Sequence, residues 1–165
     1  MEIKQVAVIG QSGVVPQHLL NIAYEIGKGL AERKITLICG GRDGVMEATC
    51  KGAAEAGGLT IGILPGLDKV EGNNFLMVVI PTGIGFARNS IVASAGDIVI
   101  AIGGSFGTLN ALTLAKTNEK TIIGVQTWTA TSHNGKNLDI LRADTAEKAL
   151  SLLDSLMSEK QATRY

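Results

Sequence analysis

The sequence has few of the residues that cross-link a chain or bind metal ions. Its 165 residues include only 2 cysteines, 2 histidines and 3 prolines, and aromatic residues make up 4%. Cys39 and Cys50 form neither a Cys-x-x-Cys pair nor a zinc set, which excludes a secreted disulfide framework and predicts a reduced, cytoplasmic compartment. Cys39 is either a nucleophile or, as is more usual for a free cysteine, a small buried residue at the end of a strand. His18 and His133 are too few for a metal site or a Ser-His-Asp triad.

An excess of charge of one sign is also missing. Lys plus Arg number 15 and Asp plus Glu number 15, so the formal net charge is zero. Affinity for a phosphate backbone depends on a positive excess, so we expect no nucleic acid and no anionic membrane as a partner. No run of 18 apolar residues occurs, which predicts that no segment spans a membrane. The start, MEIKQVAVIG, is too short and mixed for a signal peptide.

Glycine and short apolar segments are abundant instead. The chain has 21 glycines, and residues of the hydrophobic set make up 45%. Six short apolar runs alternate with segments of helical period. The expected strands are 6–9, 35–39, 59–64, 75–80, 98–102 and 121–125, and the expected helices are 19–30, 44–56, a helix from about 86, 107–116 and 145–158.

This alternation predicts the fold class. Strands that are apolar on both faces and separated by helices form a parallel sheet covered on both sides. We therefore expect a Rossmann-like, doubly wound α/β fold with a mainly parallel sheet of about six or seven strands flanked by helices. Residues 1–160 would form a single nucleotide- or phosphate-binding domain, with exposed loops at 68–74 and 128–136 and a frayed tail at 161–165. Asp144 and Glu147 predict a capping box before the last helix.

Four of the expected strands end in loops rich in glycine. Ligands of such sheets bind beyond the carboxyl ends of the strands, where free N–H groups of helix starts favour an anion and glycine lets a phosphate approach the backbone. The candidate ligand-binding residues in these loops are Gly10, Ser12, Gly13, Gly40, Gly41, Gly44, Thr82, Gly83, Arg88, Asn89, Gly103, Gly104, Ser105, Phe106, Gly107 and Thr108. Arg88 lies among apolar neighbours and suits bidentate capture of a phosphate or carboxylate. Its alternative role is a salt bridge to Asp97 or Asp43.

Two common nucleotide-binding motifs are absent. The chain after the first strand does not match the dinucleotide fingerprint G-x-G-x-x-G, and no acidic residue ends the second strand, so an NAD dehydrogenase is not expected. The P-loop pattern G-x-x-x-x-G-K-[ST] is missing as well, which excludes ATP hydrolysis by that route.

Five further motifs occur together along the chain. They are Gly40-Gly41-x-x-Gly44-x-Met46, Ile61-Gly62-Ile63-Leu64-Pro65, Thr82-Gly83-x-Gly85-x-Ala87-Arg88-Asn89, Asp97, and Gly103-Gly104-x-x-Gly107-Thr108-Leu109. This combination resembles the LOG-like Rossmann superfamily over nearly the whole chain, and within it a DprA/Smf-related branch that includes molybdenum cofactor carrier proteins. The resemblance implies a Rossmann-like fold, a nucleotide- or molybdopterin-type ligand, and a homodimer or homotetramer. Members have often been labelled lysine decarboxylases, but no lysine here stands where a pyridoxal Schiff base could form.

This chain departs from the enzymes of that superfamily at the chemical step. The LOG enzymes are phosphoribohydrolases of nucleoside 5′-monophosphates, with the motif P-G-G-x-G-T-x-x-E and an Arg-Lys pair upstream. The resemblance places Arg88 at the catalytic Arg, Asn89 at the Lys and Ala111, beside Asn110, at the terminal Glu. Breaking a glycosidic bond needs a carboxylate near the developing positive charge, and neither Ala111 nor Asn110 supplies one.

Three functions remain for the sequence. The first is a non-catalytic binding or carrier protein, with an AMP- or GMP-like nucleotide or the molybdenum cofactor as candidate ligand. The alternative is a weakened phosphoribohydrolase in which Arg88 is catalytic and Glu47 or another acid supplies the missing carboxylate. Single-stranded DNA binding, borrowed from the DNA-processing relatives, has no basic face to support it.

Overall fold

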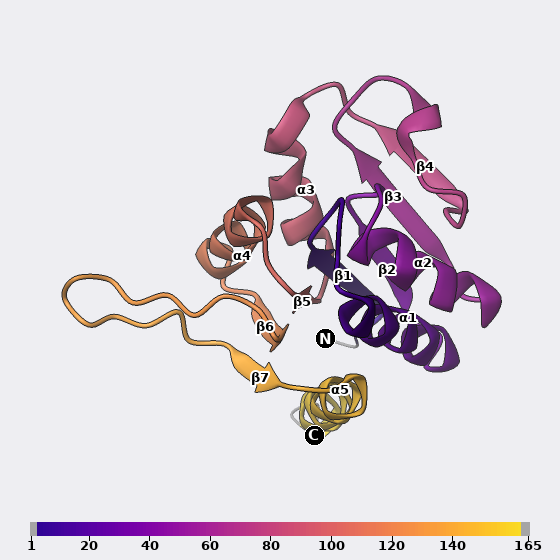
Figure 1. Cartoon of the computed structure of the whole chain (residues 1–165). Coiled ribbons are helices and arrows are strands. Elements are labelled where there is room, and N and C mark those ends of the chain that lie inside the picture. Colours follow the sequence, from indigo (N-terminus) through magenta and orange to yellow (C-terminus); the bar gives the residue numbers. More distant parts are fainter. Residues whose placement is uncertain (1–2, 163–165) are drawn as a thin grey trace.

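The protein folds into one parallel sheet between two layers of helices (Figure 1). A computed structural model describes residues 3–162. The strands are β1 (Gln5–Gly10), β2 (Thr36–Cys39), β3 (Thr60–Leu64), β4 (Val78–Pro81), β5 (Ile98–Ile102), β6 (Thr121–Val125) and β7 (Leu141–Ala143). The helices are α1 (Gln17–Glu32), α2 (Val45–Glu55), α3 (Arg88–Ala95), α4 (Phe106–Thr117) and α5 (Ala146–Ala162), with short 3₁₀ turns η1 (Lys69–Glu71) and η2 (Gly85–Ala87). The predicted fold class is confirmed.

The sheet is fully parallel, and the chain adds strands first on one side of the central strand β1 and then on the other. The seven strands run in the order β4-β3-β2-β1-β5-β6-β7. The first four strands build outward from β1 in one direction, and α3 then returns the chain to place β5 on the other side of β1. In such sheets the switch point between the two halves opens a crevice at the carboxyl ends of the strands. The crevice of this protein therefore lies where β1 and β5 end.

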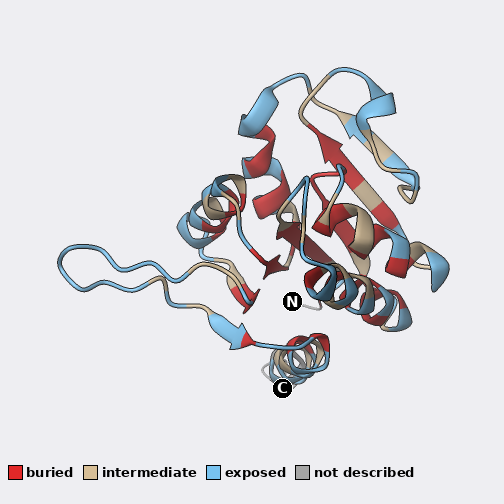
Figure 2. Ribbon diagram, viewed as in Figure 1, coloured by how far each residue is buried: buried red, intermediate tan, exposed pale blue. Residues whose placement is uncertain are grey.

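Helices cover both faces of the sheet and leave a core on each side. Helices α1, α2 and α5 pack on one face, and α3 and α4 pack on the other (Figure 1). Strand β5 is buried along its whole length, as its apolar residues on both faces predict (Figure 2). Between residues 3 and 162 no helix combines the length and the apolar character needed to cross a bilayer.

Helices α1 and α2 approach each other closely because two glycines lie at their contact. A Cβ atom at Gly27 would lie 1.9 Å from the carbonyl oxygen of Thr49, and one at Gly52 would lie 2.0 Å from that of Tyr24. Any side chain at either position would push the helices apart. The abundance of glycine therefore serves helix packing as well as loops.

Four local predictions need correction. Strand β4 begins at Val78 and not at residue 75, because Asn73 Oδ1 accepts the Phe75 N–H at 3.1 Å and turns the chain there. The last helix is capped by Thr145, whose Oγ1 accepts the Lys148 N–H at 3.1 Å, and not by Asp144. The short strand β7 was not expected. Helix α5 extends to Ala162, and residues 163–165 of the tail predicted to fray lie outside the described residues.

The connection between β6 and β7 projects from the body as a long arm (Figure 1), whose residues from 129 to 137 are exposed (Figure 2). Its two sides are joined by an antiparallel bridge between Thr131 and Asn137. At its base Trp128 is half-buried and donates its Nε1–H to the carbonyl oxygen of Ser105 at 3.0 Å. The predicted loop is thus anchored by its one tryptophan to the start of α4.

Candidate functional site

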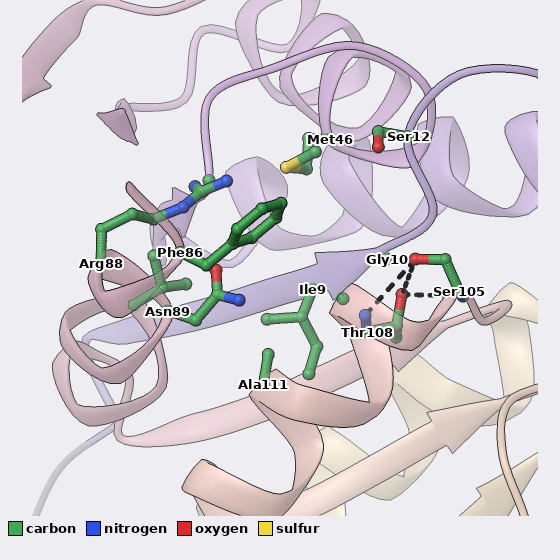
Figure 3. A pocket seen from close by; sticks show the side chains of 13 residues that line it. Ile9, Gly10, Ser12, Met46, Phe86, Arg88, Asn89, Ser105, Thr108 and Ala111 are labelled. Carbon is green, nitrogen blue, oxygen red and sulfur yellow. Dashed lines mark hydrogen bonds between the residues drawn. The ribbon is translucent and has the colours of Figure 1, made fainter. Parts of the chain in front are cut away.

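A small pocket opens at the switch point of the sheet. It has a volume of about 60 Å³ and is formed by the ends of β1 and β2 and the starts of α2, α3 and α4. The lining residues are Ile9, Gly10, Ser12, Gly40, Met46, Phe86, Arg88, Asn89, Val92, Ser105, Gly107, Thr108 and Ala111. Figure 3 shows Arg88, Phe86 and Asn89 on one side of this pocket and the hydrogen-bonded Ser105 and Thr108 on the other.

Arg88 is the only charged residue among those that line the pocket, and it is 6% exposed. One terminal nitrogen, Nη1, donates to the carbonyl oxygen of Ile63 at 2.7 Å, whereas the buried Nε has no hydrogen-bond partner in the described part of the chain. Burial lowers the pKa of the Arg88 guanidinium, and the positive charge of nearby Arg42 adds to the effect. A buried charge without a partner is costly, so this arrangement favours an anion at the guanidinium.

The salt bridge considered for Arg88 does not form. Asp97 lies at the start of β5, at the opposite edge of the sheet from the pocket. Its Oδ2 accepts the backbone N–H groups of Lys4 and Gln5 at 2.9 and 3.1 Å. Among residues 3–162, Arg88 has no carboxylate within ion-pair distance, Asp43 included.

Gly40 provides the surface on which the guanidinium lies. A Cβ atom at this position would be 2.0 Å from Arg88 Nη1 and 2.7 Å from Cζ. Every other residue would therefore displace the arginine from its place. The glycine at the end of β2, where a dinucleotide-binding protein carries an acidic residue, is needed here to admit a cation.

The start of α4 offers hydrogen-bond donors to the same pocket. Ser105 and Thr108 form a capping box, in which each side chain pairs with the backbone N–H of the other at 3.2 and 3.4 Å. The N–H groups of Phe106 and Gly107 keep no partner among the residues that the structure describes. Together with the helix dipole, these groups favour a negative charge in front of the helix.

The residues at the departures from the enzyme motif contact each other. Asn89 is 8% exposed, and its Nδ2 donates to Asn110 Oδ1 at 2.9 Å, which links α3 to α4. Ala111 lines the pocket and is 4% exposed. Where the resemblance expects a lysine and a glutamate, this chain has a neutral amide pair and a methyl group.

None of the described residues that line the pocket carries a carboxylate. Glu47 lies on α2 and lines a different groove, between α1 and α2, together with Asp43 and Lys51. That groove has a volume of about 580 Å³. Glu47 therefore does not stand where the missing glutamate would be needed. Across residues 3–162 no cluster of His, Cys, Asp and Glu is arranged to hold a metal ion.

A wider apolar groove adjoins the pocket between α3 and α4. It has a volume of about 550 Å³ and shares Phe86 and Gly107 with the pocket. The rings of Phe86 and Phe106 are 77% and 81% exposed, which is unusual for large apolar side chains. Trp128 supports Phe106, with ring centroids 5.7 Å apart. The groove is therefore much larger than the pocket that it adjoins.

The structure brings half of the predicted site residues together. Those that line the pocket are Gly10, Ser12, Gly40, Arg88, Asn89, Ser105, Gly107 and Thr108. Phe106 lines the adjoining apolar groove, and Gly13 and Gly44 line the groove between α1 and α2. The other predicted residues line none of these three hollows and are Gly41, Thr82, Gly83, Gly103 and Gly104.

These remaining residues shape the loops around the pocket. Thr82 Oγ1 and the Gly83 N–H donate to the carbonyl oxygens of Leu64 and Gly66 at 2.6 and 2.9 Å, which ties the ends of β3 and β4 together. Gly104 admits Trp128, whose Nε1 would lie 2.6 Å from a Cβ there. Sequence reasoning missed Phe86, Met46 and Trp128. The single tryptophan in an otherwise polar loop was a signal that could have indicated its anchoring role.

Comparison with known proteins places this chain in a family. Residues 3–150 match the SLOG cluster4 family. An uncharacterized protein of Archaeoglobus fulgidus is 38% identical over 126 residues, which is 76% of this chain and 82% of that protein. A cytokinin riboside 5′-monophosphate phosphoribohydrolase of Mycobacterium tuberculosis is 31% identical over 124 residues, or 68% of this chain and 66% of that enzyme.

Two solved structures are similar over almost their full length. The molybdenum cofactor binding protein of Rippkaea orientalis superposes with a TM-score of 0.84 at 31% identity, covering 95% of this chain and 99% of that one. The molybdenum cofactor carrier protein of Chlamydomonas reinhardtii superposes with a TM-score of 0.81 at 29% identity, with the same coverage. With the family match spanning most of its length, the chain belongs to the SLOG cluster4 family.

Proposed function

We propose that the protein is a non-catalytic binding or carrier protein for a small phosphate-bearing ligand with a flat ring system, of the molybdopterin or nucleotide type. The observation that carries the proposal is Arg88, a buried guanidinium without an acidic partner that lines a pocket free of carboxylates. The similarity to molybdenum cofactor binding and carrier proteins supports the molybdenum cofactor as the first ligand to test.

In this proposal the pocket and the apolar groove each hold one part of the ligand. The phosphate would occupy the small pocket, where Arg88 and the N–H groups of Phe106 and Gly107 donate hydrogen bonds. Hydrogen bonds to a charged group contribute about 1.5–3 kcal/mol each, so three or four of them supply a substantial part of the roughly 8 kcal/mol of micromolar binding. The ring would lie in the apolar groove against Phe86 and Phe106.

Thermal unfolding with added ligand tests this function. Purified protein is heated alone and with molybdenum cofactor, AMP, GMP or inorganic phosphate. A ligand at 100 times its dissociation constant stabilises the protein by about 2.7 kcal/mol. We expect at least one ring-bearing phosphate to raise the unfolding temperature more than inorganic phosphate does. The absence of a shift with all of them would refute the proposal.

A phosphoribohydrolase is the second candidate, because one curated relative carries that activity and Arg88 occupies the position of the catalytic arginine in the resemblance. The pocket speaks against it, since it lacks a carboxylate and Glu47 lines another groove. Incubation with AMP, followed by chromatography for free adenine, separates the two functions. Release of adenine that disappears in Arg88→Ala would establish the enzyme.

The exposed apolar face supports a homo-oligomer. Apolar side chains that are 40–81% exposed extend over β4, η2, α3 and the start of α4. They are Val78, Ile80, Ile84, Phe86, Ile91 and Phe106. Several large apolar side chains exposed on neighbouring elements are typical of an interaction surface, and a two-fold contact between copies is the most frequent way to cover one. Light scattering at micromolar concentration should give twice or four times the chain mass, and a monomer would contradict the expectation.

A further inference from the structure

Two thiols lie in contact next to the pocket that Arg88 lines. Cys39 ends β2, one residue before Gly40, and Cys50 lies on α2 one turn after Met46. Their sulfur atoms are 3.5 Å apart, and both residues are fully buried. Neither thiol is used by the proposed ligand-binding function.

The surroundings of Cys39 favour its ionised form. The Gly41 N–H donates to Cys39 Sγ at 3.2 Å. The Cys50 thiol, this N–H group and the positive charge of Arg88 together hold the pKa of Cys39 below its usual value, against the opposing effect of burial. The hydrogen bond to Cys39 and burial raise the pKa of Cys50, so Cys39 is the more acidic of the two thiols. In a redox-active dithiol the more acidic sulfur reacts first and its neighbour resolves the product.

We propose that Cys39 and Cys50 form a redox-active dithiol, a modification site that a small hydroperoxide converts to an intramolecular disulfide. The Cys39 thiolate attacks the peroxide, breaks its O–O bond and becomes a sulfenic acid, while the leaving oxygen takes up a proton as water or alcohol. The Cys50 sulfur then attacks the sulfenic sulfur and displaces hydroxide, which leaves as water with the Cys50 proton. Two thiols are oxidised by two electrons and one peroxide is reduced.

The geometry favours a disulfide over metal binding, which is the other chemistry open to a pair of thiols. A disulfide needs the sulfur atoms at about 2.05 Å, so the gap must close by about 1.5 Å. Both cysteines are buried, but Gly40, next to Cys39, and Met46, one turn before Cys50, line the pocket that opens to solvent, and we propose this pocket as the route for a small peroxide. A soft metal cation between the sulfurs would instead be repelled by Arg88, whose positive charge acts on Cys39.

The test follows the thiols of the full-length protein in its native state. Reduced protein is treated with a modest excess of hydrogen peroxide, the remaining thiols are alkylated, and the intact mass and peptide map are measured. We expect loss of both free thiols, a mass decrease of two hydrogen atoms and a peptide that links residue 39 to residue 50. Thiols that stay free in the folded protein, or disulfides that form only between molecules, would overturn the proposal.

Variants of the two cysteines and of Arg88 test which residue takes part in each step of the oxidation. Cys50→Ser should leave a sulfenic acid on Cys39 that dimedone traps, and Cys39→Ser should give no adduct. Arg88→Met should slow oxidation, because loss of the positive charge raises the pKa of Cys39 and lowers its thiolate fraction. An oxidation rate equal to that of the wild type in Arg88→Met would refute the role of the arginine. This assay contains no ligand, so its result is independent of the proposed binding function.

Discussion

Replacement of Arg88 by methionine tests whether the pocket holds an uncompensated charge. The change removes the desolvation cost of a buried ion, which amounts to several kcal/mol, and keeps an unbranched apolar stem. It also removes the hydrogen bond to Ile63, and a bond from a charged donor contributes about 1.5–3 kcal/mol. The first effect is the larger, so we expect ligand-free Arg88→Met to be more stable than the wild type by about 1–4 kcal/mol.

Ligand should make the wild type the more stable of the two proteins. Saturating ligand at 100 times its dissociation constant adds about 2.7 kcal/mol to the wild type, or about 5–10 °C for a domain of this size. Ligand adds no unfolding free energy to Arg88→Met, because the group that pairs with the phosphate is missing. Urea unfolding with and without ligand measures both differences in the same preparation. An Arg88→Met protein that is less stable than the wild type and still shifts fully with ligand would refute the reasoning.

Arg42→Met is the matched control for the loss of one positive charge. Arg42 is exposed, and its charge acts on Arg88 from two residues beyond Gly40. Its removal should leave the unfolding free energy within about 0.5 kcal/mol of the wild type. Ligand affinity should fall slightly and in a salt-dependent way, since exposed charges act through screened long-range attraction.

A carboxylate supplied inside the pocket should act as a built-in ligand. Ala111 lines the same pocket as Arg88, so a glutamate at this position brings an anion to the guanidinium. We expect Ala111→Glu to be more stable than Ala111→Gln, which has the same size and no charge, and to bind no phosphate. Equal unfolding temperatures and equal phosphate affinities in the two variants would show that Arg88 does not reach the pocket's anion.

Three further changes test the groove, the helix packing and a surface ion pair. Phe106→Ala should cost about 1–3 kcal/mol of affinity for a ring-bearing phosphate and none for inorganic phosphate, as calorimetry will show. Gly52→Ala places a methyl group 2.0 Å from the Tyr24 carbonyl oxygen and should lower stability by about 1–3 kcal/mol in urea unfolding. Arg33 bonds to Asp154 at 2.7 Å and lowers the pKa of that carboxyl group, so its stabilisation is present above the unfolded pKa of about 3.9 and is lost as the pH falls through the folded value. Asp154→Asn should therefore cost about 0.2–1 kcal/mol at neutral pH and nothing in strong acid.

The fold was predictable because each central strand carries its own signal. Val6 to Ile9 and Ile98 to Ile102 are apolar at every position, which only a strand covered on both faces requires, and the structure buries them accordingly. The errors occurred where tertiary contacts outweigh local pattern. Leu141–Ala143 is too short and too polar to be read as a strand, and it exists because β6 offers an edge to pair with.

The position of the pocket was predictable from the sequence, but its lining residues were not. Glycine-rich loops after parallel strands indicate the edge of the sheet at which the pocket opens, because the carboxyl ends of all strands meet there. The same signal cannot separate Gly40, which admits the guanidinium, from Gly103, where the N–H donates to Val125 across the sheet. Gly40 is required because the guanidinium lies against its backbone, and Gly103 because its φ is +61°, and only the folded chain distinguishes the two requirements. Arg88 differs from both glycines. An arginine between apolar neighbours in the sequence is expected to be buried with them, but only the folded chain shows that it has no acidic partner.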